Sequence, residues 1–314
     1  MTAGGYGGWQ SNPSEAPRPG AVPLRALDLG DIIVGLARCL RYAAPTILAV
    51  AATAGICNGL VEGLSEAFAP RSGNLDLWLT RSPGDGISGR TVVAGAVTGL
   101  VAVAISQFAA SLIAIAVSRA VLGRRTSVAE ALAAMRGRVG PLAGVVAATL
   151  GLTLGMGAGA ACVIALGAWT GGIGPLVAIL AALGLLVGGT YVSIHIALAP
   201  VVAVLEGVSA GQALVRAWHL AAGSAWRILG ISLLASLTAM AVSIVPSIVI
   251  SIPLALLATA GGGAMSMVAV GLVSAVTFTV ALPIVAGVLA LLYVDVRIRR
   301  ENLGPVLEQA ARES

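Results

Sequence analysis

The sequence has few charged and few aromatic residues. Charged side chains make up 10% of the 314 residues and aromatic side chains 4%, whereas 58% are hydrophobic. Soluble domains carry about 25% charged residues, so this composition excludes a water-soluble globular protein. Lysine is absent: all 18 basic residues are arginine, which is typical of a GC-rich bacterial genome. Three scattered cysteines are too few for a disulfide framework.

Six long apolar runs are present instead, separated by connectors that carry most of the charge. A hydrocarbon core about 30 Å thick needs about 20 helical residues to span it. Because lipid offers the backbone no hydrogen-bond partner, each run must be a helix. The sequence therefore predicts an all-α polytopic membrane protein with six transmembrane helices. The runs lie at roughly 43–66, 92–118, 141–168, 175–205, 228–257 and 264–294.

Glycines four residues apart recur within these runs. Such small-residue pairs let transmembrane helices approach closely, although they also arise by chance in a glycine-rich chain. Taken together they favour a tight bundle over a wide pore. The sets are Gly95 with Gly99, Gly151 with Gly155 and Gly159, and Gly184 with Gly188.

The arginines are divided unevenly between the two sides of the predicted membrane domain. Fifteen lie at the termini and in the connectors after the second and fourth runs, and three lie in the connector at about 67–91, the one sizeable external loop. Arginine-rich segments stay in the cytoplasm, so both termini are predicted to be cytoplasmic in a bacterial plasma membrane. We expect residues 1–25 to be a disordered tail without signal-peptide features, 26–300 the membrane domain, and 301–314 a short tail.

A similar local pattern precedes the first, third and fifth runs. It places a capping side chain three residues before an acidic or amide residue, which is typical of a capping box at a helix start. An amphipathic stretch with arginine on its polar side follows each, as in helices that lie in the membrane plane. The sequence thus predicts three repeats of an interfacial helix plus a helical hairpin, unless helices after loops are simply capped often. The pairs are Asp28 with Asp31, Ser127 with Glu130, and Ser209 with Gln212.

Ionised groups are absent from the middle of all six runs, where two neutral polar side chains stand out. Charges at the bilayer centre are costly and are retained mainly for function. Gln107 in the second run and His195 in the fourth are the candidate intramembrane polar sites. For both, the sequence favours a structural interpretation: Gln107 bonds a neighbouring helix, and His195 bonds a backbone carbonyl or hydroxyl. A lone histidine cannot make a metal site.

Charged residues gather where the runs meet the predicted cytoplasmic side. Glu206 is expected to pair with Arg119 or Arg216, and Asp295 with Arg299. Such pairs would latch the interfacial helices to the bundle; the alternative is solvated, unpaired carboxylates. Arginines here also attract anionic head groups, by about 1 kcal/mol each. The candidate lipid or latch contacts are Arg38, Arg41, Arg124, Arg125, Arg136, Arg138, Arg216, Arg227, Glu206, Asp295, Arg297, Arg299 and Arg300.

Three segments resemble a family of bacterial, mostly actinobacterial, membrane proteins. They are 29–32 with Arg38 and Arg41, 205–207 with 213–220, and 291–301, which is the most specific. The family is the membrane domain attached to some glycerophosphodiester phosphodiesterases, also found alone. The resemblance covers roughly 27–303 and implies six membrane helices and a lipid or envelope context. It does not imply the activity, because we expect no metal-binding catalytic domain in the 13 residues after Glu301.

These features favour a non-enzymatic scaffold or accessory protein in lipid or cell-envelope processes, with membrane lipids, anionic ones included, and a membrane protein as partners. The alternative is a transporter or lipid-handling conduit without ion coupling, which repeats and kinked helices suit. An enzyme is disfavoured, since no nucleophile–base pair, phosphate loop, HExxH or CxxC pattern is present. We expect no cofactor and no nucleic-acid partner, because membrane orientation accounts for the net charge of +5.

Overall fold

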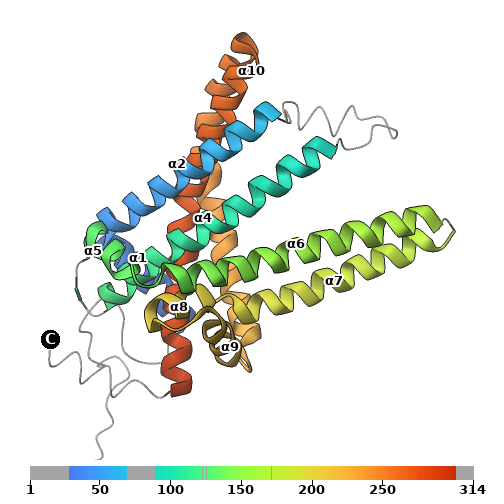
Figure 1. The fold of residues 1–314 in the computed structure, drawn as a ribbon. Coiled ribbons are helices and arrows are strands. Elements are labelled where there is room, and N and C mark those ends of the chain that lie inside the picture. The colour runs from blue at the N-terminus through green and yellow to red at the C-terminus, as the bar shows by residue number, and fades with distance from the viewer. Residues whose placement is uncertain (1–27, 69–88, 122, 125, 171, 302–314) are drawn as a thin grey trace, which may run out of the picture.

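The computed structural model describes residues 28–68, 89–121, 123–124, 126–170 and 172–301 (Figure 1). The predicted tail at 1–25, most of the predicted external loop, and the segment after residue 301 lie outside the described residues, as does Arg125. Throughout the described ranges the regular secondary structure is helical. In chain order the helices are α1 (Leu29–Tyr42), α2 (Ala44–Phe68), α4 (Gly89–Val121), α5 (Val128–Met135), α6 (Val139–Thr170), α7 (Gly174–Ile196), α8 (Ala199–Glu206), α9 (Ala210–Ala221) and α10 (Ala225–Glu301).

Six lengths of helix are long and apolar enough to cross a membrane. Each coincides within a few residues with one of the six runs in the sequence, which confirms the predicted all-α, six-helix membrane protein. The agreement follows from hydropathy alone, because a run of about 20 apolar residues has no other stable place in lipid. The lengths are Ala44–Phe68, Gly89–Val121, Val139–Thr170, Gly174–Glu206, Ala225–Leu257 and Gly261–Arg300.

The helix α10 is a hairpin that turns at Gly262. Its first limb is Ala225–Leu257 and its second limb is Gly261–Arg300, and Figure 1 shows the turn at the far end of the molecule from α9. Gly262 has φ 68° and ψ −159°, a conformation that is essentially restricted to glycine. The prolines at 246, 253 and 283 remain inside the two limbs without ending them.

Glycines bring α2 and the second limb of α10 into backbone contact. A Cβ atom on Gly59 would lie 2.3 Å from the carbonyl oxygen of Gly271, and one on Gly55 would lie 2.5 Å from that of Ala275. Gly63, one turn further, faces the carbonyl of Met267 at 2.8 Å in the same way. The glycines of α2 therefore leave room only for the backbone and the small side chains of the second limb, and the two helices pack closely along this seam.

The six membrane-length helices are buried to very different extents. In α2, α4 and the second limb of α10, 44, 39 and 44% of the most apolar stretch is buried, against 6, 11 and 6% in α6, in α7 with α8, and in the first limb. The helices α6 and α7 pack on each other and extend to one side of α2 and α10 (Figure 1). A tight bundle therefore exists around α2, α4 and the second limb, while much of the α6–α7 hairpin extends away from this bundle.

The glycine sets noted in the sequence are mostly not the ones that join helices. In the α6–α7 hairpin the close contacts are instead Gly167 against Ala178 and Gly189 against Met156. A four-residue spacing shows which residues share a helix face, but it does not show which face meets another helix. A Cβ atom would meet no other atom within 4 Å at Gly99, Gly151, Gly155, Gly184 or Gly188.

We predict that Gly59→Ala destabilises the protein by about 1–3 kcal/mol, because the added methyl must separate α2 from the second limb of α10. The control is Gly151→Ala, whose methyl meets open space in α6 and which should be neutral or slightly stabilising, since alanine is the better helix former. Thermal unfolding in detergent, followed by tryptophan fluorescence, measures both. Equal midpoints for the two variants would contradict the glycine seam.

Candidate functional site

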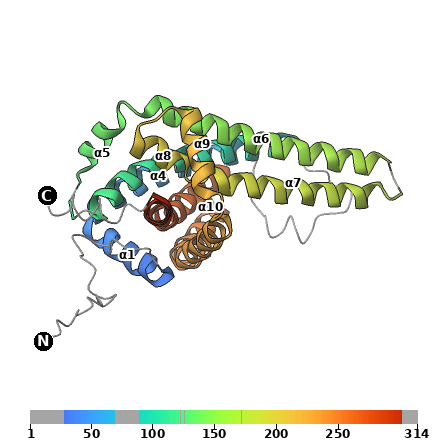
Figure 2. The same ribbon diagram turned by 90° about the horizontal axis from the view of Figure 1, so that it is seen from below.

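The short helices gather at one end of the molecule, together with both ends of α10 (Figures 1 and 2). We call this end, formed by α1, α5, α8, α9 and the adjoining ends of α2, α4 and α10, the arginine-rich end. Each of α1, α5 and α9 begins with a capping box and precedes two membrane-length helices. The three-fold repeat itself stays a prediction, because the hairpins that follow differ in burial.

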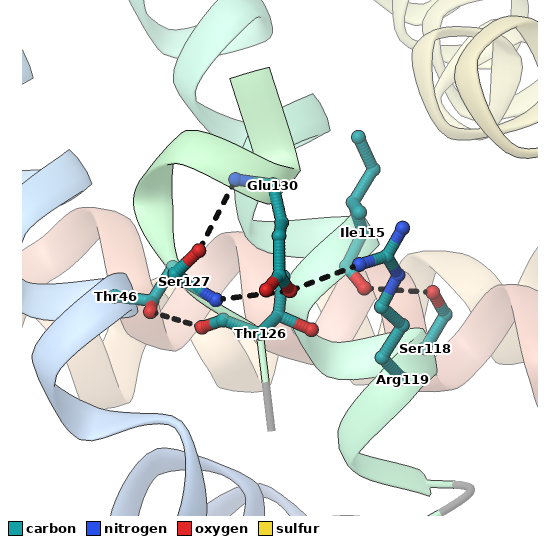
Figure 3. A network of polar contacts seen from close by, with 7 residues as sticks. All are labelled: Thr46, Ile115, Ser118, Arg119, Thr126, Ser127 and Glu130. Atoms are coloured by element: carbon teal, nitrogen blue, oxygen red, sulfur yellow. Dashed lines mark hydrogen bonds and ion pairs between the residues drawn. The ribbon is translucent and has the colours of Figure 1, made fainter. Parts of the chain in front are cut away.

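Figure 3 shows how the start of α5 is held. The Ser127 hydroxyl accepts from the Glu130 backbone N–H at 3.2 Å, and Glu130 in turn accepts from the Ser127 N–H at 3.4 Å. Arg119 at the end of α4 lies 3.5 Å from the same carboxylate, and the Thr46 hydroxyl donates to the carbonyl of Thr126. The start of α5 is thus tied to α2 and α4. Arg119 pairs with Glu130, not with Glu206.

Glu206, the last residue of α8, joins α8 to α9 and to the second limb of α10. Its carboxylate forms an ion pair with Arg216 of α9 and accepts a hydrogen bond from the Tyr293 hydroxyl at 2.8 Å. Arg297 lies 4.0 Å from the carboxylate, donates to the Tyr293 oxygen at 3.1 Å, and sits over the Tyr293 ring. Gly207, at φ 67°, then lets the chain turn sharply into α9.

Asp295 is fully buried between two arginines that come from opposite ends of α10. Arg227 at the start of the first limb donates to Oδ2 from Nε at 3.2 Å and from Nη2 at 3.0 Å. Arg299 near the end of the second limb donates to Oδ1 at 2.9 Å. The exposed fraction of Asp295 is 0%. A buried carboxylate needs such charge-assisted bonds on both oxygens, so these contacts fasten the open end of the α10 hairpin.

Two more arginines bind the carboxyl ends of short helices. Arg138 donates to the carbonyl of Val204 near the end of α8, and Arg300 donates to that of His219 in the last turn of α9 at 2.9 Å. Unpaired carbonyls and the negative end of the helix dipole favour a cation at these positions. The remaining candidate arginines are exposed at the same end: Arg38, Arg41, Arg124 and Arg136.

The two candidate intramembrane residues lie in different places. Gln107 donates from Nε2 to the Thr149 hydroxyl at 2.8 Å, which links α4 to α6. His195 is 3% exposed, and its Nδ1 lies 2.8 Å from the carbonyl oxygen of Tyr191. Its ring also stacks against Tyr191 at 4.3 Å and against Trp218 of α9 at 4.5 Å between centroids. His195 therefore sits at the junction of α7 and α9, away from Gln107.

A match to a protein family covers most of the described helices. A family model described as a domain of unknown function (DUF7847) matches residues 32–296. The chain belongs to the DUF7847 family. The match includes Glu206, Arg227, Tyr293 and Asp295, the residues that fasten the arginine-rich end. Searches of curated proteins and of solved structures each found no match.

Several contacts of this DUF7847 protein are not visible in sequence. Asp295 and Arg299 are four residues apart, so a helical pairing could be anticipated, whereas Arg227 is 68 residues away along the chain. No sequence pattern predicts that Tyr293 contacts Glu206 or that Trp218 contacts His195. Within the described ranges, no cluster of three or more histidine, cysteine, aspartate or glutamate side chains is placed to hold a metal. The arrangement is suited to fixing helices and presenting positive charge.

We predict that Glu206→Gln lowers the free energy of unfolding by about 1–3 kcal/mol, because the charge partner of Arg216 and Arg297 is lost. Glu130→Gln is the matched control. Its side chain is 58% exposed, and glutamine preserves the capping box, so the expected loss is below about 0.5 kcal/mol. Thermal unfolding in detergent at low and high salt compares them. A loss in Glu130→Gln as large as in Glu206→Gln would contradict the central role of Glu206.

Proposed function

We propose that this protein is a non-enzymatic scaffold or accessory component of the bacterial plasma membrane that binds anionic lipid at its arginine-rich end. Both termini then lie in the cytoplasm, and the six membrane-length helices serve to anchor and orient the arginines. A membrane protein of the lipid or envelope machinery is the expected partner.

The uneven placement of arginine is the observation that carries this proposal. Among the described residues, Arg90 lies at the start of α4, at the opposite end from the arginine-rich end. Positive charge on one side is what orients membrane proteins toward the cytoplasm, whose leaflet is anionic and attracts arginine by about 1 kcal/mol per residue. The arginines at the arginine-rich end are Arg38, Arg41, Arg119, Arg124, Arg136, Arg138, Arg216, Arg227, Arg297, Arg299 and Arg300.

The arginines at this end fall into two groups, those paired with carboxylates and those exposed on the surface. Arg227 and Arg299 are engaged with buried Asp295, and Arg216 with Glu206. Arg38 and Arg41 are exposed on α1, while Ile32, Leu36 and Cys39 of that helix are buried. One group of arginines thus holds the helices, and the other faces outward, where head groups are found.

The resemblance of 29–32, of 205–207 with 213–220, and of 291–301 to the membrane domain of some glycerophosphodiester phosphodiesterases supports a lipid context. The absence of enzymatic activity is part of the proposal. The two carboxylates that join the helices of the arginine-rich end, Glu206 and Asp295, are engaged with arginines, so neither is poised as a general base.

We predict that the purified protein retains phosphatidylglycerol in preference to phosphatidylcholine when native mass spectrometry is performed from an equimolar mixture. Arg38→Gln with Arg41→Gln should reduce that preference, because two outward charges are lost. Arg90→Gln, which removes one charge at the opposite end, is the control and should leave it unchanged.

Three results would contradict the proposal. One is retention of both lipids in equal amounts. Another is lipid or solute flux in reconstituted vesicles at a rate above that of protein-free vesicles, which would favour the alternative of a conduit. Turnover of a glycerophospholipid by the purified protein would contradict its non-enzymatic character.

A further inference from the structure

Two hollows lie on either side of α9 and share the side chains of Val215 and His219. The first, which we call the polar hollow after its Gln212, Arg216, His219 and Arg300 side chains, has a volume of about 590 Å³; its lining also includes Gly211, Val215 and Leu220. The second, which we call the apolar groove, has a volume of about 390 Å³ and lies between α6, α7 and α9. Figure 2 shows α9 between the base of the α6–α7 hairpin and α10. Polar and apolar surfaces therefore adjoin along one helix.

The polar hollow offers positive charge that the fold holds in place. Arg300 is fixed by its bond to the His219 carbonyl at 2.9 Å, and a guanidinium has five N–H donors, so one such bond leaves donors for an anion. Arg216 is fixed by Glu206. The hollow therefore presents the Arg300 guanidinium, with Arg216 held beside it on α9.

The apolar groove offers a surface for a hydrocarbon chain. Leu152 of α6 and Val192 and Ile196 of α7 form its walls, and Val215 and Trp218 of α9 form its floor. The Trp218 ring is held by the His195 ring at 4.5 Å, and by Tyr191 in an edge-on contact at 6.1 Å. Tryptophan and tyrosine favour the level of the lipid head groups, which is the level that joins a polar hollow to an apolar groove.

We propose that the two hollows form one site for a single anionic phospholipid. Its phosphate lies against Arg216, Arg300 and His219, and one acyl chain lies in the groove between α6 and α7. A neutral lipid does not use the Arg300 guanidinium, and a soluble phosphate does not use the groove, so the combined surface fits an anionic phospholipid best. This inference rests on the proposed function and assigns its lipid to a defined place.

The experiment uses native mass spectrometry of the full chain with phosphatidylglycerol, and two variants that act on different halves of the site. Arg300→Gln removes a head-group contact, and Val215→Trp fills the groove without changing the charge. We expect each to weaken retention of one phosphatidylglycerol by about tenfold or more, as the loss of one charge-assisted bond or one apolar subsite does. Arg300→Lys should recover part of the loss. Arg90→Gln, which changes an exposed arginine at the start of α4, outside both hollows and at the opposite end of the molecule, is the control with unchanged retention.

Thermal midpoints of all variants separate loss of the site from loss of the fold. If Arg300→Gln lowers the thermal midpoint, its loss of lipid cannot be assigned to the site. Retention of phosphatidylglycerol by Val215→Trp, measured at an unchanged midpoint, then tests the site. Retention in Val215→Trp equal to that in Arg90→Gln, while the unaltered protein still prefers phosphatidylglycerol, would overturn this site and leave the proposed function standing. A lack of preference in the unaltered protein would instead overturn the proposed function. Displacement of the lipid by millimolar inorganic phosphate or glycerol phosphate would show a site for soluble anions and would also overturn the inference.

Discussion

The contact on which the arginine-rich end depends is the buried Asp295 carboxylate between Arg227 and Arg299. A carboxylate with no exposure is stable only when its oxygens are bonded and its charge is compensated. Two guanidinium groups from opposite ends of α10 meet both needs. Because Arg227 stands at the start of the first limb, the pairing fixes where that limb begins, and therefore where α9, directly before it, must lie.

A second ionic contact extends this constraint to the rest of the end. Glu206 joins α8 to α9 through Arg216 and to the second limb through Tyr293. Once α9 is placed, its outer side lies beside Arg300, and its other side lies against α6 and α7. The polar hollow and the apolar groove thus follow from the same contacts that hold the helices. The far ends of α6 and α7 carry no such constraint and extend away from the core (Figure 1).

The sequence predicts those parts of the molecule that depend on local pattern. Hydropathy gives all six membrane-length helices, and the spacing of Ser127 and Glu130 gives the start of α5. Contacts between distant segments are different. The four-residue spacing of glycines does not predict the seam at Gly59, and it wrongly favours packing at Gly151. The spacing shows which residues share a helix face, but it does not show which helix that face contacts. For the same reason Arg299 could be assigned to Asp295, and Arg227 could not.

A double-mutant cycle on Arg227 and Asp295 measures how strongly the buried carboxylate is coupled to the start of the first limb. The unfolding free energies of Arg227→Gln, Asp295→Asn and the double variant are measured in detergent, with Arg119 and Glu130 as an exposed reference pair. We predict a coupling free energy of about 1–3 kcal/mol for the buried pair and below about 1 kcal/mol for the exposed pair. Additive effects of Arg227→Gln and Asp295→Asn, within about 0.3 kcal/mol, would contradict it.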